Sequence, residues 1–140
     1  MNAESPHIKK VEEADIPRCV EIAREAYPDR DTALSLPWFT WCVKSPRHLV
    51  LIGSGTVGVA SLNVHYGTEL RPRLDLLYSI PVRRHGLEAL TMVRIMLRWS
   101  KQQGAKPPFF LGSEGGFDFG PFAKRLGGWQ NQNPSYEIPF

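Results

Sequence analysis

A basic turn that leads into a helix is the segment with the clearest chemical potential. Residues 80–88 read Ile-Pro-Val-Arg-Arg-His-Gly-Leu-Glu, with an apolar strand pattern before them and a long helical pattern after them. The first turn of a helix offers N–H groups without partners and carries a partial positive charge. Gly86 lets a ligand approach the backbone, and Arg83 and Arg84 add formal charge. The segment therefore predicts an anion site, of the kind that binds phosphate groups.

Glu88 is the acidic residue of this segment, and two roles are open to it. A carboxylate in the first helical turn complements the helix dipole without any ligand. If an anion binds at the turn, we expect the side chain to point outward, towards solvent or Arg84. If none binds, we expect Glu88 itself to satisfy the helix end.

Asp75 and Glu114 are the candidate general bases. Asp75 lies in a strand pattern, Leu-Asp-Leu-Leu over 74–77, so one strand face could turn its carboxylate towards a cleft. The alternative is an ion pair on the sheet with Arg71 or Arg73, which is at least as well supported by the pattern. His65 and Tyr78 are weaker candidates.

Aromatic side chains gather between residues 38 and 41. Trp38, Phe39 and Trp41 could form the wall of a pocket for an acceptor molecule. They could also cover the hydrophobic core, and this interpretation is favoured because aromatic residues dominate core burial.

Hydrophobic periodicity predicts the elements that must position these residues. Helices are expected over 15–27, 33–43, 87–103 and 119–126. Strands are expected over 7–11, 48–52, 56–65, 73–80 and 109–112, with a closing hairpin over 129–140. A loop containing Gly67 and Pro72 should precede the strand at 73. In the long helix, Leu87, Leu90, Val93 and Leu97 should form the buried stripe, beside Met96 and opposite a basic face. The order predicts an α/β domain around a mixed sheet.

Composition limits the classes of function. The chain has 140 residues, of which 42% are hydrophobic, and a formal net charge of +3. This length suits one domain. Residues 71–106 hold eight basic and two acidic side chains, which suits a phosphate-rich ligand or a solvated face. Because aromatic residues are sparse among these charges, nucleic acid is disfavoured as a partner.

The cysteines and the apolar runs indicate a cytoplasmic protein. Cys19 and Cys42 form no CxxC pair, so neither a metal cluster nor a disulfide framework is expected. The N-terminus lacks the apolar core of a secretory signal. No apolar run approaches the length needed to span a membrane.

The chain resembles the GNAT (general N-acetyltransferase) superfamily in the order of its elements and in three short motifs. Residues 83–86 match the first four positions of the family pattern [Gln/Arg]-x-x-Gly-x-[Gly/Ala]. Residues 57–60 are similar to the family's third strand. Residues 121–129 resemble its closing segment of an aromatic residue, a basic residue, glycine and a second aromatic residue.

The resemblance implies a single GNAT-like domain over 1–140, with about six to seven strands and an acyl-CoA cleft between the fourth and fifth. Acetyl-CoA would lie near 76–82 and 109–113, and an amine would attack its thioester directly. The pantetheine would pair with backbone near Ile80 and Val82, and the pyrophosphate would rest on the N–H groups of 84–88. The cofactor-binding residues would be Ile80, Val82, Arg83, Arg84, His85, Gly86, Leu87 and Glu88. The acceptor pocket would include Trp38, Trp41 and Tyr78, and no metal is implied.

A catalytically inactive binding or structural subunit with the same fold is the alternative. Phe122 stands where family members often have a tyrosine acid, and Ser113 and Glu114 stand where an asparagine is common. A repurposed copy of an enzyme would show such changes. The amine acceptor is not identified by the sequence, and a homodimer or a larger assembly stays open.

Overall fold

The computed structural model describes residues 7–83, 87–112, 120–132 and 135–140. It contains a seven-stranded mixed sheet with the order β1-β2-β3-β4-β5-β7-β6. All neighbouring strands are antiparallel except β4 and β5, which are parallel. The strands are β1 (Lys9–Lys10), β2 (His48–Ile52), β3 (Thr56–His65), β4 (Glu69–Ser79), β5 (Phe109–Gly112), β6 (Trp129–Gln132) and β7 (Ser135–Ile138).

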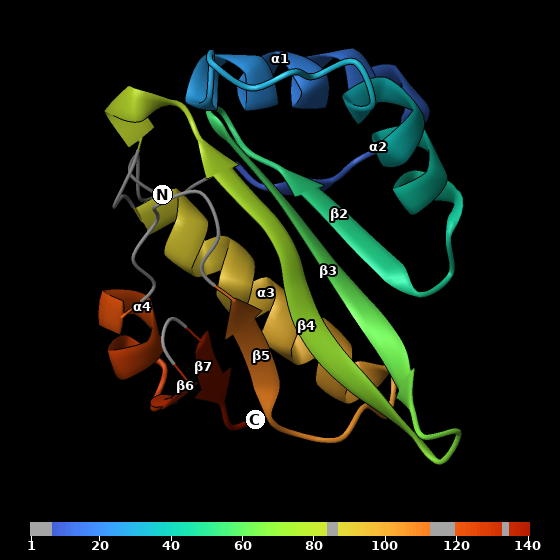
Figure 1. Ribbon diagram of the computed structural model, residues 1–140, viewed down its shortest axis with the longest axis vertical. Helices are drawn as coiled ribbons and strands as arrows, with labels where there is room; N and C mark the ends of the chain where they lie inside the picture. The colour runs from blue at the N-terminus through green and yellow to red at the C-terminus, as the bar shows by residue number, and fades with distance from the viewer. Residues whose placement is uncertain (1–6, 84–86, 113–119, 133–134) are drawn as a thin grey trace.

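Helices cover both faces of this sheet (Figure 1). The α-helices are α1 (Ile16–Ala26), α2 (Ser35–Lys44), α3 (Leu87–Gln102) and α4 (Gly120–Arg125). One core cluster joins α1 and α2 to Val50 and Ile52 of β2. A second joins α3 and α4 to Leu49 and Leu51 of the same strand. Because alternate residues of a strand point to opposite faces, α1 and α2 lie on one side of the sheet, and α3 and α4 lie on the other. This mixed α/β architecture confirms the expected fold class.

The long helix α3 forms where its apolar period predicts it, but its buried stripe is rotated. Leu87 is 47% exposed, and Leu97 is only partly buried. The fully buried positions include Met92, Val93 and Met96, whose spacing of one, three and four residues defines a single helix face. Leu87 was therefore a wrong core prediction, because the face that meets the sheet is centred on the methionines.

Strand β4 begins at Glu69, four residues before the predicted start at 73. Pro72, which was expected in a loop, pairs with Leu62 of β3 inside the ladder. Leu62 donates its N–H to Arg47 on its other side, so its pair with Pro72 is one that uses no hydrogen bond between the two strands. The missing N–H of proline therefore costs this pairing nothing, and the strand continues through it.

Both cysteines are free thiols in the core. Cys19 of α1 and Cys42 of α2 are fully buried in the cluster between these helices and the sheet. Across the described ranges, no helix is both long and apolar enough to cross a membrane. Among the same residues, no group of three or more His, Cys, Asp or Glu side chains could hold a metal ion.

Candidate active site

Strands β4 and β5 separate where the resemblance places the cofactor cleft. Within the described residues, they pair only at Arg73 with Phe110 and at Leu74 with Leu111, while β4 runs on to Ser79. The edge of β4 beyond Leu74 therefore lacks a described strand partner on the β5 side. Backbone groups on such an edge can pair with an extended ligand, as they would with another strand.

The backbone groups that face this edge are not those predicted from the sequence. Ile80 donates its N–H to the carbonyl of Gly55, in the turn between β2 and β3. Because backbone direction alternates along an antiparallel ladder, the groups of Leu77 and Ser79 are the ones that point towards β5. Val82, the other residue expected to pair with the pantetheine, is 84% exposed in a 3-10 turn over Pro81–Arg83.

The rest of the predicted cofactor site is only partly described. Arg84, His85 and Gly86 lie outside the described residues, and Arg83 is described through its backbone alone. Helix α3 begins directly after them at Leu87, as predicted. The predicted helix N-terminus is therefore confirmed, but the positions of the basic side chains before it stay predictions.

Glu88 takes neither of the orientations expected for it. Its side chain is buried and reaches the β2–β3 turn, where its carboxylate accepts three hydrogen bonds. The backbone N–H and the hydroxyl of Ser54 each lie 2.9 Å from Oε2, and the N–H of Gly55 lies 3.0 Å from Oε1. The carboxylate thus joins the start of α3 to the hairpin, and it points neither to solvent nor back to its own helix end.

Two further features fit this contact between Glu88 and the turn. A Cβ atom at Gly53 would meet the Glu88 carboxyl group, so the absence of a side chain there gives the carboxylate its space. Burial raises the pKa of the Glu88 carboxyl, but the hydrogen bonds from Gly55 and Ser54 help to outweigh burial, and the pKa lies below its ordinary value. The charged form is therefore the one that the fold stabilises.

Asp75 is the extra residue of a bulge in β4. Val59 pairs with Leu76 and Ala60 with Leu74, so Asp75 has no partner of its own on β3. A bulge of this kind redirects a side chain. The Asp75 carboxylate lies on the α1–α2 side of the sheet and is 15% exposed, at the point where β5 leaves β4. It therefore lies beside the edge of β4 that has no described strand partner.

The Asp75 carboxylate has two basic neighbours. Arg73 donates from Nε to Oδ1 at 2.9 Å, which confirms the ion pair given as the alternative role. His48 Nε2 lies 3.7 Å from Oδ2, and its Nδ1 lies 2.7 Å from the hydroxyl oxygen of Ser45. His48 was not predicted as a site residue from the sequence. Its position at the start of β2, opposite Ser61 and two strands away from Asp75, gave no local signal. Glu114, the other candidate base, lies outside the described residues.

The three predicted pocket residues do not form one wall. Trp41 is 58% exposed, and its ring packs edgewise against His48 at 4.8 Å, so it lies beside the Asp75 group. Trp38 packs against Phe39 in the core, as its alternative role required. Tyr78 packs against Tyr27 at 4.7 Å and accepts a hydrogen bond from Arg30.

A hollow of about 300 Å³ lies on the part of the sheet next to Asp75. We call it the open-face hollow. It is lined by Asn63, His65, Arg71, Pro72, Arg73, Pro108, Phe110 and Glu137. Arg73 belongs both to this lining and to the Asp75 ion pair, so the hollow and the candidate base adjoin. His65, the weaker candidate base, lies in the hollow rather than at Asp75.

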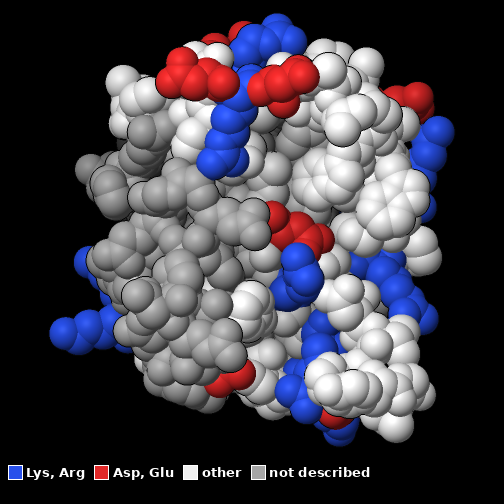
Figure 2. Space-filling view, in the orientation of Figure 1, with Lys and Arg blue, Asp and Glu red and all other residues white. Residues whose placement is uncertain are grey.

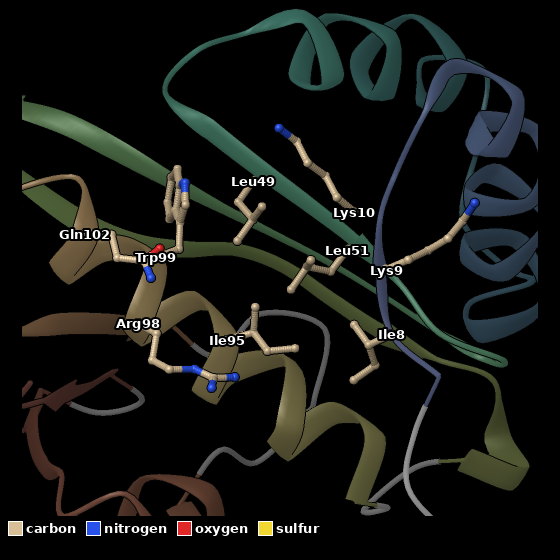
Figure 3. Close-up of a pocket in the computed structure, with 9 residues that line it drawn as sticks. All are labelled: Ile8, Lys9, Lys10, Leu49, Leu51, Ile95, Arg98, Trp99 and Gln102. Carbon is tan, nitrogen blue, oxygen red and sulfur yellow. The ribbon is translucent and has the colours of Figure 1, made fainter.

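A second groove, of about 370 Å³, lies on the other side of the sheet, between β1, β2 and α3 (Figure 3). Leu49 and Leu51 form part of its apolar floor, and Trp99 stands at one end. The ammonium groups of Lys9 and Lys10 point away from that floor, and Lys9 is paired with Asp15 at 3.0 Å. None of the predicted site residues lines this groove, so we place the candidate active site on the α1–α2 side.

Solved structures with the same architecture are similar to this chain at low sequence identity. An aminoglycoside 6'-N-acetyltransferase from Acinetobacter haemolyticus shares 20% identity at a TM-score of 0.71, over 90% of this chain and 92% of that one. A predicted acetyltransferase from Clostridium acetobutylicum, solved with acetyl-CoA, shares 15% identity at a TM-score of 0.72, over 93% of both chains. A transcriptional regulator from Bacillus halodurans shares 12% identity at a TM-score of 0.72, over 91% of this chain and 95% of that one.

No family model matches the chain, and no curated protein matches it. The structural similarity nevertheless extends over nearly the whole chain and includes acetyltransferases of the GNAT type. The chain therefore has the GNAT fold, which confirms the resemblance found in the sequence.

Proposed function

We propose that this protein is an acetyl-CoA-dependent N-acetyltransferase. The observation that carries the proposal is the edge of β4 beyond Leu74, which has no strand partner among the described residues, with the Asp75 carboxylate beside it. In this assignment, the backbone of Leu77 and Ser79 pairs with the pantetheine, and the start of α3 receives the pyrophosphate. Two similar structures support this assignment. One is the predicted acetyltransferase solved with acetyl-CoA, and the other is an aminoglycoside N-acetyltransferase in complex with coenzyme A.

The proposed reaction depends mainly on a general base and on correct positioning of the two substrates. Asp75 takes a proton from the ammonium form of the acceptor, directly or through one water molecule. The free amine nitrogen then attacks the acetyl carbonyl carbon, the carbon–sulfur bond breaks, and a proton returns to the coenzyme A sulfur. The products are an acetamide and the free thiol, so no oxidant or metal enters the balance. Holding the amine and the thioester in contact supplies much of the rate enhancement.

Calorimetric titration of the chain with acetyl-CoA tests the proposal. We expect saturable binding, followed by appearance of an acetylated product in mass spectra when a panel of primary amines is added. A flat titration at millimolar acetyl-CoA would refute the proposal.

A non-catalytic role is the second candidate. Two observations favour it: the pairing of the candidate base with Arg73, and the similar structure described as a transcriptional regulator. Binding of acetyl-CoA without transfer to any amine of the panel would support this role instead.

A further inference from the structure

The open-face hollow lies on a part of the sheet where basic side chains gather. In Figure 2, Lys and Arg side chains appear on the face seen below the α1–α2 layer. The strand registers explain this arrangement: Asn63 pairs with Arg71, and Arg73 pairs with Phe110. These residues occupy alternate positions of adjacent strands, so their side chains point to the same side. Of the charged residues that line the hollow, two are arginines and one is Glu137.

Arg71 has hydrogen-bonding capacity that the described residues do not use. Its Nη2 donates to Glu69 Oε1 at 2.8 Å. Its Nε is buried and has no hydrogen-bond partner. A buried donor of a charged group is unfavourable when it lacks an acceptor, and a guanidinium offers its N–H groups in a fork that matches carboxylate and phosphate oxygens. The Nε atom itself is closed to a ligand, but the Arg71 side chain is 38% exposed and lines the hollow, so its guanidinium can meet an anionic group there.

The hollow also lies at a useful distance from the candidate base. Arg71, Arg73 and Asp75 follow one another at every second position of β4. Along the strand, Arg73 therefore starts about 7 Å from Asp75 and Arg71 about 14 Å from it, apart from the local effect of the bulge. A small molecule that places its amine at Asp75 can therefore place a second group, a few bonds away, beside Arg73, where the long side chain of Arg71 can reach it by extending along the strand.

We propose that the acceptor of this protein is a primary amine that also carries a carboxylate or a phosphate, and that Arg71 and Arg73 hold this anionic group in the open-face hollow. The inference rests on the proposed acetyl transfer and assigns its substrate class. The anionic group takes no part in the chemistry: the new bond joins the amine nitrogen to the acetyl carbon. A polycationic acceptor such as an aminoglycoside would instead place ammonium groups against guanidinium groups, which disfavours it.

Matched pairs of amines test the inference. The first pair is 4-aminobutanoate and its amide, and the second is O-phosphoethanolamine and ethanolamine. Kanamycin serves as the polycationic amine. With the full chain and acetyl-CoA, we expect kcat/KM for at least one anionic member to exceed that of its uncharged partner by about tenfold or more, the ratio expected for one charge-assisted contact. The pair with the larger ratio distinguishes carboxylate from phosphate. Equal values within both pairs, or kanamycin as the best acceptor, would overturn the inference.

Variants of Arg71 connect this preference to the hollow. Arg71→Gln should raise KM for the preferred anionic amine by about tenfold, with little change in kcat and no change for its uncharged partner. Arg71→Lys keeps the charge but lacks the guanidinium fork. Its KM for the preferred anionic amine should lie between the values of the natural chain and of Arg71→Gln. Arg94→Gln, at an exposed arginine of α3, is the matched control and should change nothing. An Arg71→Gln variant that folds and keeps its full preference would refute the assignment.

Direct titration separates this inference from the proposed function. 4-Aminobutanoate and O-phosphoethanolamine are each titrated into the protein without acetyl-CoA, and the affinity is compared with that of Arg71→Gln. Suppose that acetyl-CoA does not bind, but that one of the two anionic amines binds and Arg71→Gln lowers its affinity. The hollow is then an anion site, and only the proposed acetyl transfer is refuted. If acetyl-CoA binds and its acetyl group is transferred, but neither anionic amine binds or has a higher kcat/KM than its uncharged partner, only the inference about the hollow is refuted.

Discussion

At the scale of single residues, Asp75 is the group whose role is most open to test. Asp75→Asn keeps the size of the side chain and removes its basicity. We expect kcat to fall by about 10² to 10⁴-fold, the usual contribution of a general base, while the affinity for acetyl-CoA stays unchanged. The measurements are steady-state kinetics and calorimetry.

Glu21→Gln is the matched control for this substitution, because Glu21 is an exposed carboxyl on α1. It should leave both kinetics and binding unchanged. If Asp75→Asn kept its kcat, Asp75 would be only the partner of Arg73, and His48 would become the next group to test.

Glu88 makes a prediction about stability and pH. Its folded pKa lies below the ordinary value of 4.5, so the unfolded chain takes up the proton first as the pH falls. The stability that this carboxylate contributes is therefore complete above pH 4.5 and is lost as the pH drops through the folded pKa. Glu88→Gln should lower the free energy of unfolding at pH 7 by about 1–3 kcal/mol, because charge-assisted hydrogen bonds from the turn are lost.

Thermal unfolding at several pH values checks this prediction. The difference between the natural chain and Glu88→Gln should be largest near neutral pH and should shrink in acid. A difference that stays constant from pH 7 to pH 3 would mean that packing, rather than the charge of Glu88, accounts for its effect.

At the scale of elements, the same contact should couple the β2–β3 hairpin to α3. Gly53→Ala would place a methyl group against the Glu88 carboxyl group and displace it. We expect it to cost about 1–3 kcal/mol in urea unfolding, similar to Glu88→Gln. Because both changes break one contact, the double variant should lose less than their sum, by about 0.5–3 kcal/mol. Additive losses would show that the turn and the helix start are stabilised independently.

The elements themselves were largely predictable from the sequence, whereas their contacts were not. The hairpin over 48–65 and the helix from 87 are encoded by local period and by glycine, so both were predicted almost to the residue. Pro72 was placed in a loop because a proline alone does not show which pairs of a ladder need an N–H. The destination of Glu88 depends on a turn more than thirty residues earlier in the chain, and no local pattern records such a contact.

The candidate site likewise contains residues whose contacts could be predicted from the sequence and residues whose contacts could not. Asp75 and its partner Arg73 could be predicted, because they lie at alternate positions of one strand. His48 and the open-face hollow could not, because they depend on which strands become neighbours: β3, β4, β5 and β7 all contribute to the hollow. Side-chain period identifies the face of a strand, but register against other strands determines which side chains meet on that face.

At the scale of the whole molecule, the two core thiols report how the protein opens. Burial raises the pKa of Cys19 and of Cys42 to about 12, so neither forms much thiolate near neutral pH. We expect iodoacetamide to label them slowly in the native protein and rapidly in guanidinium chloride, as followed by the intact mass. Labelling at comparable rates in both conditions would contradict the buried position of these residues.

Comparing the labelling rate with and without acetyl-CoA tests whether the protein opens cooperatively. The thiols lie between α1, α2 and the sheet, while the proposed cofactor site lies at the β4 edge and the start of α3. A ligand that binds only the folded state stabilises it by RT ln(1 + [L]/Kd), so acetyl-CoA at about 100 times its Kd should slow labelling about 100-fold if the thiols become accessible only by global unfolding. Arg94→Gln should behave as the natural chain does. If bound acetyl-CoA left the labelling rate unchanged, the α1–α2 layer would open on its own, and acceptor binding on that side could proceed without loss of the cofactor.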